Sequence, residues 1–123
     1  MIEEEATGVL DFDALRHAIE GADPDALLGF YSEDAGLRIV HASLPDCVAF
    51  ELKGRSQIER YLHAVCDQQV ERHLEGEAVR EGDRISFTEE CEYPEGSRIR
   101  VKTILEIEEG LIQHQLDVVE ERS

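Results

Sequence analysis

The chain has 123 residues, of which 41% are hydrophobic and 33% are charged, which is enough for one compact domain with its own core. Its formal net charge of -17 argues against nucleic acid and anionic membranes as partners, because their phosphates require Lys and Arg. No apolar run approaches the roughly 20 residues of a membrane span, and the acidic start lacks the features of a signal peptide. We therefore expect a cytoplasmic protein.

The first part of the chain predicts two short helices. In DFDALRHAIEGAD, Asp11 is a candidate N-cap and Gly21 a candidate stop. The next segment, DPDALLGFYSED, restarts at once, with Asp23 as the cap and Pro24 at the first helical position, where no backbone N–H is needed. We expect this second helix to bury a stripe formed by Leu27, Phe30 and Tyr31.

The middle of the chain predicts a strand at 36–42, a loop at 43–47 and a second strand at 48–52. The segment GRSQIERYLHAVCD follows and is the clearest helix of the sequence. Ser56 and Glu59 have the spacing of a capping box at its start. The apolar residues recur at helical spacing and are Ile58, Tyr61, Leu62 and Val65.

After this helix the hydrophobic pattern changes to a period of two, which predicts strands. Three turns that contain glycine, REGD, PEGS and EEGL, punctuate the rest of the chain. The strands that they separate are expected at 69–79, 84–93, 97–108 and 111–120.

This order of elements indicates an α+β fold, with helices first and an antiparallel meander afterwards. We expect one domain over 11–120, preceded by an acidic extension over 1–10. A curved antiparallel sheet with three helices over its concave face leaves a cone-shaped hollow, and such hollows are natural sites for a small ligand.

The hairpin around the PEGS turn has a well-determined register. Strand pairing about this turn gives one face that is almost wholly apolar and one that carries opposite charges. The charged pairs are Glu92 with Arg98 and Glu90 with Arg100. Glu89 breaks the pattern, because it lies on the apolar face opposite Val101.

The last hairpin has two alternative registers. A three-residue loop over 108–110 turns Asp117 onto the apolar face that carries Glu89. A two-residue turn over 109–110 flips every side chain and places Asp117 outside, beside Lys102. Turn chemistry favours the first register, whereas hydrophobic matching favours the second.

Three segments, DPDALLGFYSEDAGLRIV, ELKGRSQIERYLHAV and EEGLIQHQLDVV, resemble the SnoaL-like branch of the nuclear transport factor 2-like superfamily. The resemblance covers nearly the whole chain but includes no sharply diagnostic motif. It implies a cone-shaped α+β barrel with a deep apolar pocket, commonly dimeric through the outer sheet face. Members include polyketide cyclases, dehydratases, isomerases and epoxide hydrolases, and many others have no known activity.

The resemblance also bears on the direction of Asp117. The last strand in this family often reads Gly, apolar residues and then, seven positions on, the Asp that acts as acid/base, and Gly110 and Asp117 match this spacing. The match favours the inward register. Leu15 and Ile39 stand where ketosteroid isomerases carry their oxyanion donor and base, so that activity is not expected.

Three residues are candidates for acid/base catalysis. Asp117 is the first, since burial in an apolar pocket would raise its pKa toward neutrality, although a salt-bridged or solvated Asp is the alternative. Glu89 could supply a second carboxyl, or it could reach water at the pocket mouth. His41 follows the inward alternation of its strand and could assist, or it could be a hydrogen-bonded core residue.

The expected ligand-binding residues share the apolar face of the sheet or the adjoining helix. They are Tyr31, Phe30, Phe87, Val101, Thr103, Gln115 and Gln113.

The sequence predicts neither a metal nor a cofactor. Cys47, Cys66 and Cys91 are widely spaced and form no CxxC, so free, mostly buried thiols are expected. The histidines lack partners at metal-ligand spacing. There is no phosphate loop, nucleophile elbow or dinucleotide fingerprint.

Two functions follow from this reading. One is a cofactor-independent cyclase, dehydratase or isomerase that acts on a small apolar carbonyl or polyketide-like molecule. The other is a non-catalytic module of the same fold that binds a ligand or a protein partner. In the inward register the outer sheet face is apolar and predicts a homodimer through Ile104, Ile112, Leu116 and Val118.

Overall fold

The computed structural model describes residues 10–122, and the side chains of all of these except 44–49, 121 and 122. Positions 1–9 of the expected acidic extension therefore lie outside the described residues. Leu10 is described, and it is buried in the core rather than part of an extension.

The two N-terminal helices begin where their caps predict, and the first also ends at its predicted stop, Gly21. α2 spans Phe12–Glu20, with the side chain of Asp11 accepting a hydrogen bond from the N–H of Ala14 at 3.2 Å. α3 spans Pro24–Leu28, and Asp23 accepts from the N–H of Ala26 in the same way. Each carboxylate satisfies a backbone donor that the first turn of a helix leaves free.

The third helix, α4, spans Arg55–Cys66, but the predicted capping box does not form. Gly54 is the N-cap, so Ser56 lies inside the first turn and makes no capping hydrogen bond. Gly54 has φ of 92°, a conformation that suits glycine, and this lets the chain leave the preceding strand directly into the helix. The predicted apolar face is correct, with Ile58 and Leu62 buried.

The first two strands are longer than predicted. β1 spans Tyr31–His41, because Tyr31 pairs with Ile112 of the last strand in a parallel ladder. Phe30 and Tyr31 therefore lie beyond α3 rather than on its buried stripe. β2 spans Leu44–Lys53, so most of the loop predicted at 43–47 belongs to a strand.

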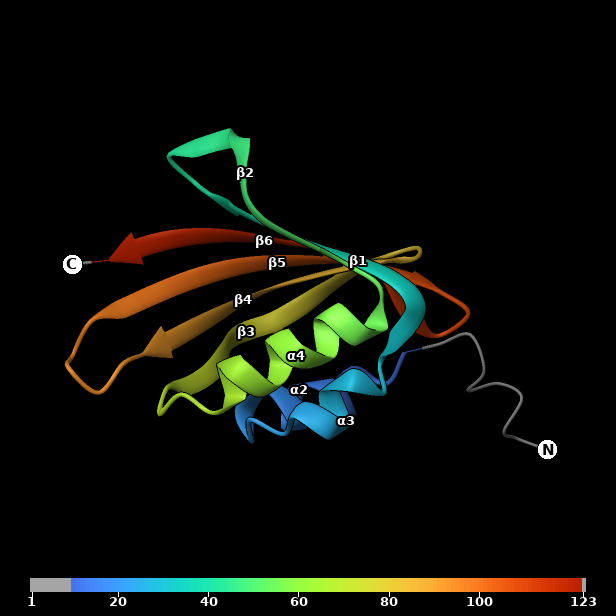
Figure 1. Ribbon diagram of the computed structural model, residues 1–123, viewed down its shortest axis with the longest axis horizontal. Helices are drawn as coiled ribbons and strands as arrows, with labels where there is room; N and C mark the ends of the chain where they lie inside the picture. Colours follow the sequence, from blue (N-terminus) through green and yellow to red (C-terminus); the bar gives the residue numbers. More distant parts are fainter. Residues whose placement is uncertain (1–9, 123) are drawn as a thin grey trace.

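The four remaining strands lie close to their predicted positions, at β3 (Glu71–Glu81), β4 (Arg84–Glu92), β5 (Arg98–Glu108) and β6 (Leu111–Arg122). Within residues 10–122 the sheet has six strands in the order β2-β1-β6-β5-β4-β3. All neighbours are antiparallel except β1 and β6. Figure 1 shows this sheet curving strongly, with the three helices on its concave side. The α+β fold expected from the sequence is confirmed.

The last hairpin follows neither predicted register throughout. Glu109 and Gly110 form a two-residue turn, both with positive φ, as in the alternative that placed Asp117 outside. The ladder then shifts by one residue at Gln113, which is the extra residue of a β-bulge. Beyond the bulge Asp117 pairs with Thr103 and faces inward. The bulge thus keeps Ile112 and Asp117 on the same buried face, although they are five positions apart.

Because of the bulge, the outer face of the sheet differs from the predicted one. Ile112 is buried against the core, so it does not belong to the patch that was expected to form a dimer. Ile104, Leu116 and Val118 do lie on the face opposite Thr103 and Asp117, where each stays partly exposed. In the part of the chain that the structure describes, no helix is long and apolar enough to cross a membrane.

The contact between α4 and the sheet gives a first prediction. Ile58 is fully buried, so Ile58→Ala should lower the free energy of unfolding by about 2–5 kcal/mol, through lost apolar burial and the cavity left behind. Urea denaturation of Glu59→Ala, an exposed position on the same helix, should stay within about 0.5 kcal/mol of the wild type. Equal effects of the two substitutions would show that α4 does not pack as described.

Candidate functional site

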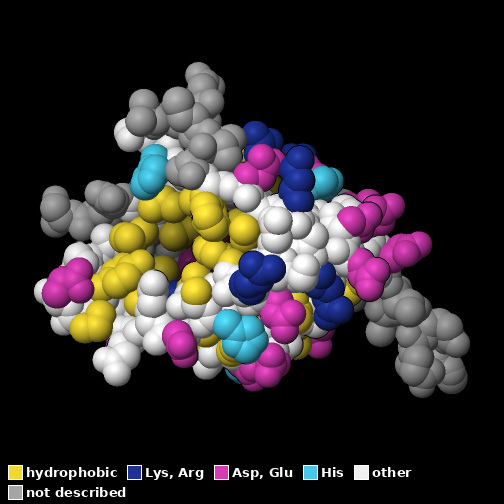
Figure 2. Space-filling model, in the orientation of Figure 1, with side chains coloured by type: hydrophobic (Ala, Val, Ile, Leu, Met, Phe, Trp, Pro, Cys, Tyr) yellow, Lys and Arg dark blue, Asp and Glu magenta, His cyan; other side chains and the backbone are white. Residues whose placement is uncertain are grey.

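A cavity of about 320 Å³ lies between the concave face of the sheet and the helices. Most of its wall is apolar, contributed by side chains such as Leu15, Leu37, Leu62, Phe87 and Ile112. Figure 2 shows hydrophobic side chains gathered around a hollow on this face of the molecule. The volume and the apolar wall are typical of a small-molecule site.

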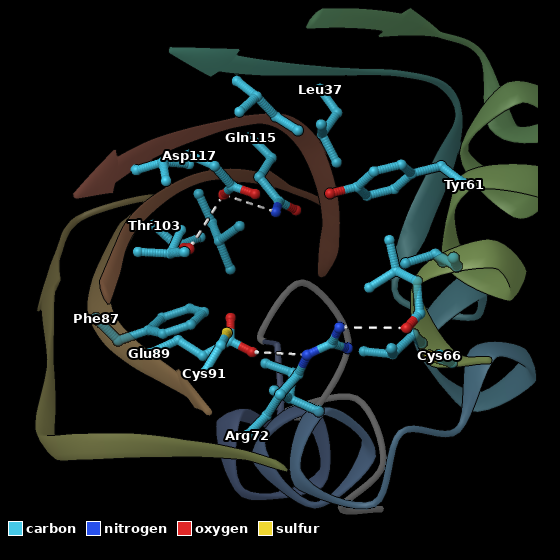
Figure 3. A pocket seen from close by; sticks show the side chains of 18 of the residues that line it. Leu37, Tyr61, Cys66, Arg72, Phe87, Glu89, Cys91, Thr103, Gln115 and Asp117 are labelled. Atoms are coloured by element: carbon cyan, nitrogen blue, oxygen red, sulfur yellow. Dashed lines mark hydrogen bonds and ion pairs between the residues drawn. The ribbon is translucent and has the colours of Figure 1, made fainter. Parts of the chain in front are cut away.

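Asp117 lies in this wall and accepts two hydrogen bonds on one oxygen. The hydroxyl of Thr103 donates to Oδ1 at 3.1 Å, and the amide Nε2 of Gln115 donates to the same atom at 3.0 Å. No side chain of the described residues donates to the other oxygen, Oδ2. Figure 3 shows the carboxyl pointing into the cavity between these partners. Its orientation is fixed, while one oxygen is left for a ligand.

Burial decides the charge of Asp117. The residue is 9% exposed, and removal from water raises the pKa of its carboxyl from 3.8 to about 6. The hydrogen bonds from Gln115 and Thr103 favour the charged form and hold the pKa below the value that burial alone would give. The carboxyl can therefore give or take a proton near neutrality.

Glu89 is the second carboxyl of the cavity, on β4. Burial raises its pKa to about 7, and the negative charge of Asp117 adds to this rise. Arg72 opposes it, with Nε at 3.9 Å from Oε2 of Glu89, which is an ion pair without a direct hydrogen bond. Two carboxyls with raised pKa values thus face one apolar space.

Two tyrosine hydroxyls reach the same end of the cavity as Asp117. Tyr31 donates its hydroxyl to Oε1 of Gln115 at 2.5 Å, and this fixes the amide so that its nitrogen meets Asp117. Tyr61 comes from α4, and its hydroxyl points into the cavity (Figure 3). Burial raises the pKa of both phenols, so both hydroxyls keep their protons at neutral pH.

Two thiols lie near the other carboxyl. Cys66 and Cys91 are both free and both line the cavity, whereas the side chain of Cys47 lies outside the described residues. Burial raises the pKa of Cys91 to about 11, so its thiol is protonated and has little nucleophilic character.

Most of the predicted site residues line this one cavity. Tyr31, Glu89, Val101 and Thr103 do so together with Phe87, Gln115 and Asp117. Glu89 of β4 pairs with Val101 of β5, whereas Asp117 of β6 pairs with Thr103 of β5. The two carboxyls are therefore two strands apart and offset along the strands, instead of lying directly across from each other through Val101.

Three predicted residues lie elsewhere. His41 is exposed at the end of β1, because two register shifts after Ile39 interrupt the alternation from which its inward direction was predicted. Phe30 packs against the core but does not reach the cavity. Gln113 is the bulge residue, and it hydrogen-bonds Ser32 and, at 3.5 Å, Asp34 of β1 instead of facing a ligand.

Sequence reasoning missed four polar residues of the cavity, which are Tyr61, Gln68, Arg72 and Tyr93. Tyr61 was assigned to the apolar stripe of its helix, which ignores its hydroxyl. Arg72 was not considered, although pairing of β3 with β4 places it opposite Cys91 on the inward face. Working out the register of the hairpin formed by β3 and β4 would have identified Arg72 as an inward-facing residue. Within the described residues, no group of three or more His, Cys, Asp or Glu side chains could hold a metal ion.

Comparisons with known proteins identify the fold. No protein-family model matches the chain, and no curated protein matches its sequence. A nuclear transport factor 2-like protein of unknown function from Mesorhizobium loti superposes with a TM-score of 0.76 at 19% identity, over 88% of this chain and 86% of that one. A candidate isomerase of the SnoaL-like family from Agrobacterium tumefaciens gives a TM-score of 0.63 at 16% identity, over 88% and 92% of the two chains.

A third solved structure was obtained with a ligand. This protein from Catenulispora acidiphila has a ketosteroid isomerase-like fold and is in complex with trimethylamine; it gives a TM-score of 0.64 at 19% identity, over 86% of this chain and 82% of that one. At such identities the likeness shows the fold alone. The chain has the nuclear transport factor 2-like fold, as its resemblance implied, and structures that share it include a member of the SnoaL-like family.

The raised pKa values predict how stability depends on pH. Asp117 and Glu89 bind protons more tightly in the folded chain, so their contribution to stability is full below pH 4 and is lost as pH rises through about 6 and 7. The stability of the wild type relative to Asp117→Asn should therefore fall as pH rises across this range. Urea denaturation at a series of pH values measures the difference.

Glu89→Gln should show the same trend, displaced to the higher pH range. Glu59→Gln, at an exposed position of α4, provides the matched control, and its difference from the wild type should stay flat. A flat difference for Asp117→Asn as well would contradict the burial of a titrating carboxyl at this site.

Proposed function

We propose that the protein is a cytoplasmic enzyme that needs no cofactor and moves a proton on a small, mostly apolar carbonyl or polyketide-like molecule. The class of reaction is isomerisation, cyclisation or dehydration. The observation that carries this proposal is the pair of carboxyls, Asp117 and Glu89, whose pKa values burial raises to about 6 and about 7 inside one apolar cavity. The free thiols Cys66 and Cys91 fit a reducing compartment.

Asp117 is the proposed base. As a carboxylate it takes a proton through Oδ2 from the carbon next to the carbonyl of the ligand, while Thr103 and Gln115 hold Oδ1. A base whose pKa lies near the working pH is efficient, because it is ionised and still basic enough to accept a proton.

Tyr61 is the proposed donor to the developing enolate. None of the described side chains accepts a hydrogen bond from its hydroxyl, and the raised pKa keeps that hydroxyl protonated. A donor placed in a dry cavity stabilises negative charge on the carbonyl oxygen. Glu89 in its protonated form returns a proton at a second carbon, so that the proton count of the substrate is unchanged after isomerisation. Asp117 then releases its proton to water and Glu89 takes one up, which restores both carboxyls.

A prediction tests the proton transfer without knowledge of the natural substrate. In D₂O buffer near neutral pH, the protein should accelerate the exchange of the hydrogens next to the carbonyl of α-tetralone, followed by NMR. Asp117→Asn keeps the size of the side chain but removes the base, and the acceleration should fall on the order of a hundredfold or more. Glu59→Gln is the control and should retain the wild-type rate.

Tyr61→Phe should slow the exchange less than Asp117→Asn, because the base remains and one donor is lost. Exchange by the wild type no faster than by Asp117→Asn, with both folded, would contradict the catalytic proposal. The protein would then be a non-catalytic ligand-binding module. The Catenulispora acidiphila protein of similar fold is in complex with a small molecule, trimethylamine.

We also propose a homodimer through the outer face of the sheet. Ile104, Leu116 and Val118 form a partly exposed apolar strip on that face, and burial against a second copy would remove it from water. Sedimentation should give twice the chain mass of 13.9 kDa. Leu116→Arg should shift the protein to monomers, whereas Glu59→Arg on α4 should not. A monomer mass that does not change with concentration would contradict the dimer.

A further inference from the structure

Arg72 is the one Lys or Arg among the described residues that line the cavity. It comes from β3, opposite Cys91, and its side chain is only 10% exposed. A guanidinium carries five N–H donors, cannot lose its charge, and is costly to bury unless those donors find acceptors. Its presence in an apolar cavity therefore calls for a partner.

The protein offers the guanidinium of Arg72 one oxygen acceptor and two thiols, which leaves donors for a ligand. Nη2 donates to the carbonyl oxygen of Val65 at 3.2 Å. Nε lies 3.9 Å from the nearest oxygen of Glu89, beyond hydrogen-bond distance. The thiols of Cys66 and Cys91 also accept from the guanidinium, but sulfur is a weak acceptor. The phenols of Tyr61 and Tyr93 lie close enough to feel its charge. Figure 3 shows the guanidinium directed into the cavity, between Glu89 and α4.

We propose that Arg72 binds a carboxylate of the ligand, so that the substrate class is an amphipathic organic acid. Its apolar body would fill the cavity. Its carboxylate would receive the free donors of Arg72, and its reacting carbonyl would lie toward Asp117. The first part of this proposal stands on Arg72 alone, whereas the placement of the carbonyl rests on the proposed function.

The charges around Arg72 set the conditions for binding. The groups that face it are Glu89 and Cys91 from β4, Tyr93 just after β4, and Tyr61 and Cys66 from α4. The carboxyls of Asp117 on β6 and Glu20 on α2 act on Glu89 and raise its pKa. A ligand carboxylate beside Arg72 repels the carboxylate of Glu89, so binding favours the protonated form of Glu89. The acid should therefore bind more tightly as pH falls from about 8 to about 6.

The test uses two ligands of the same shape, naphthylacetate and its neutral isostere naphthylacetamide, titrated by calorimetry. The wild type should bind the acid on the order of tenfold more tightly than the amide at about pH 6, because the guanidinium bonds a charged carboxylate more strongly than a neutral amide oxygen. Arg72→Gln should lose this preference, because its affinity for the acid falls while its affinity for the amide stays the same. Arg98→Gln, an exposed arginine of β5, is the control and should keep it.

Arg72→Lys and Glu89→Gln keep the proposal testable if Arg72→Gln does not fold. The lysine retains the charge and should preserve part of the preference for the acid. Glu89→Gln should bind the acid with an affinity that no longer depends on pH between about 6 and 8. Circular dichroism establishes that each variant is folded before it is titrated.

The outcomes separate this proposal from the catalytic one. Equal affinity of the wild type for acid and amide overturns the role of Arg72 and leaves the proposed catalysis standing. Preference for the acid without deuterium exchange on ketones supports the role of Arg72 and contradicts the catalysis. Absence of binding by both ligands overturns the carboxylate proposal for this cavity, together with the small-molecule function on which its second part rests.

Discussion

The β-bulge at Gln113 is the feature on which the rest of the site depends. A strand alternates its side chains between two faces, so a regular β6 could not turn both Ile112 and Asp117 inward. The extra residue lets Ile112 close the core next to the turn while Asp117 enters the cavity five positions later. Gln113 itself hydrogen-bonds Ser32 and Asp34, which ties the bulge to β1. The position of the acid is thus a consequence of backbone geometry.

The electrostatics of the cavity follow from that placement. The chain carries a net charge of -17, but the cavity is apolar and holds two carboxyls and one guanidinium. Because the interior solvates charge poorly, burial raises the pKa of both carboxyls toward neutrality. The hydrogen bonds from Thr103 and Gln115 limit this rise at Asp117, and Arg72 limits it at Glu89. Each acid therefore has a local partner that sets how strongly it holds its proton.

The sequence predicted the fold well because its signals are local. Asp11 and Asp23 cap the helices they precede, and the charge pairs around the PEGS turn specify the register of β4 with β5. The same reasoning predicted that Glu89 lies on the apolar face, which the cavity shows.

The errors arose where distant segments override local patterns. The bulge at Gln113 combines the turn of one register with the inward Asp117 of the other, and no local signal in QHQ marks it. His41 was assigned by alternation, but irregular pairing of β1 with β2 turns it to solvent. Arg72 was missed because its inward direction depends on pairing between β3 and β4.

The central claim is that Asp117 is a buried acid that titrates near neutrality within the cavity. Its pKa can be measured directly from the carboxyl carbon chemical shift over a pH titration, with the signal assigned by comparison with Asp117→Asn. The account predicts a pKa of about 6. A value near the ordinary 3.8 would show that the carboxyl is solvated, and would contradict both the inward placement of Asp117 and the chemistry built on it.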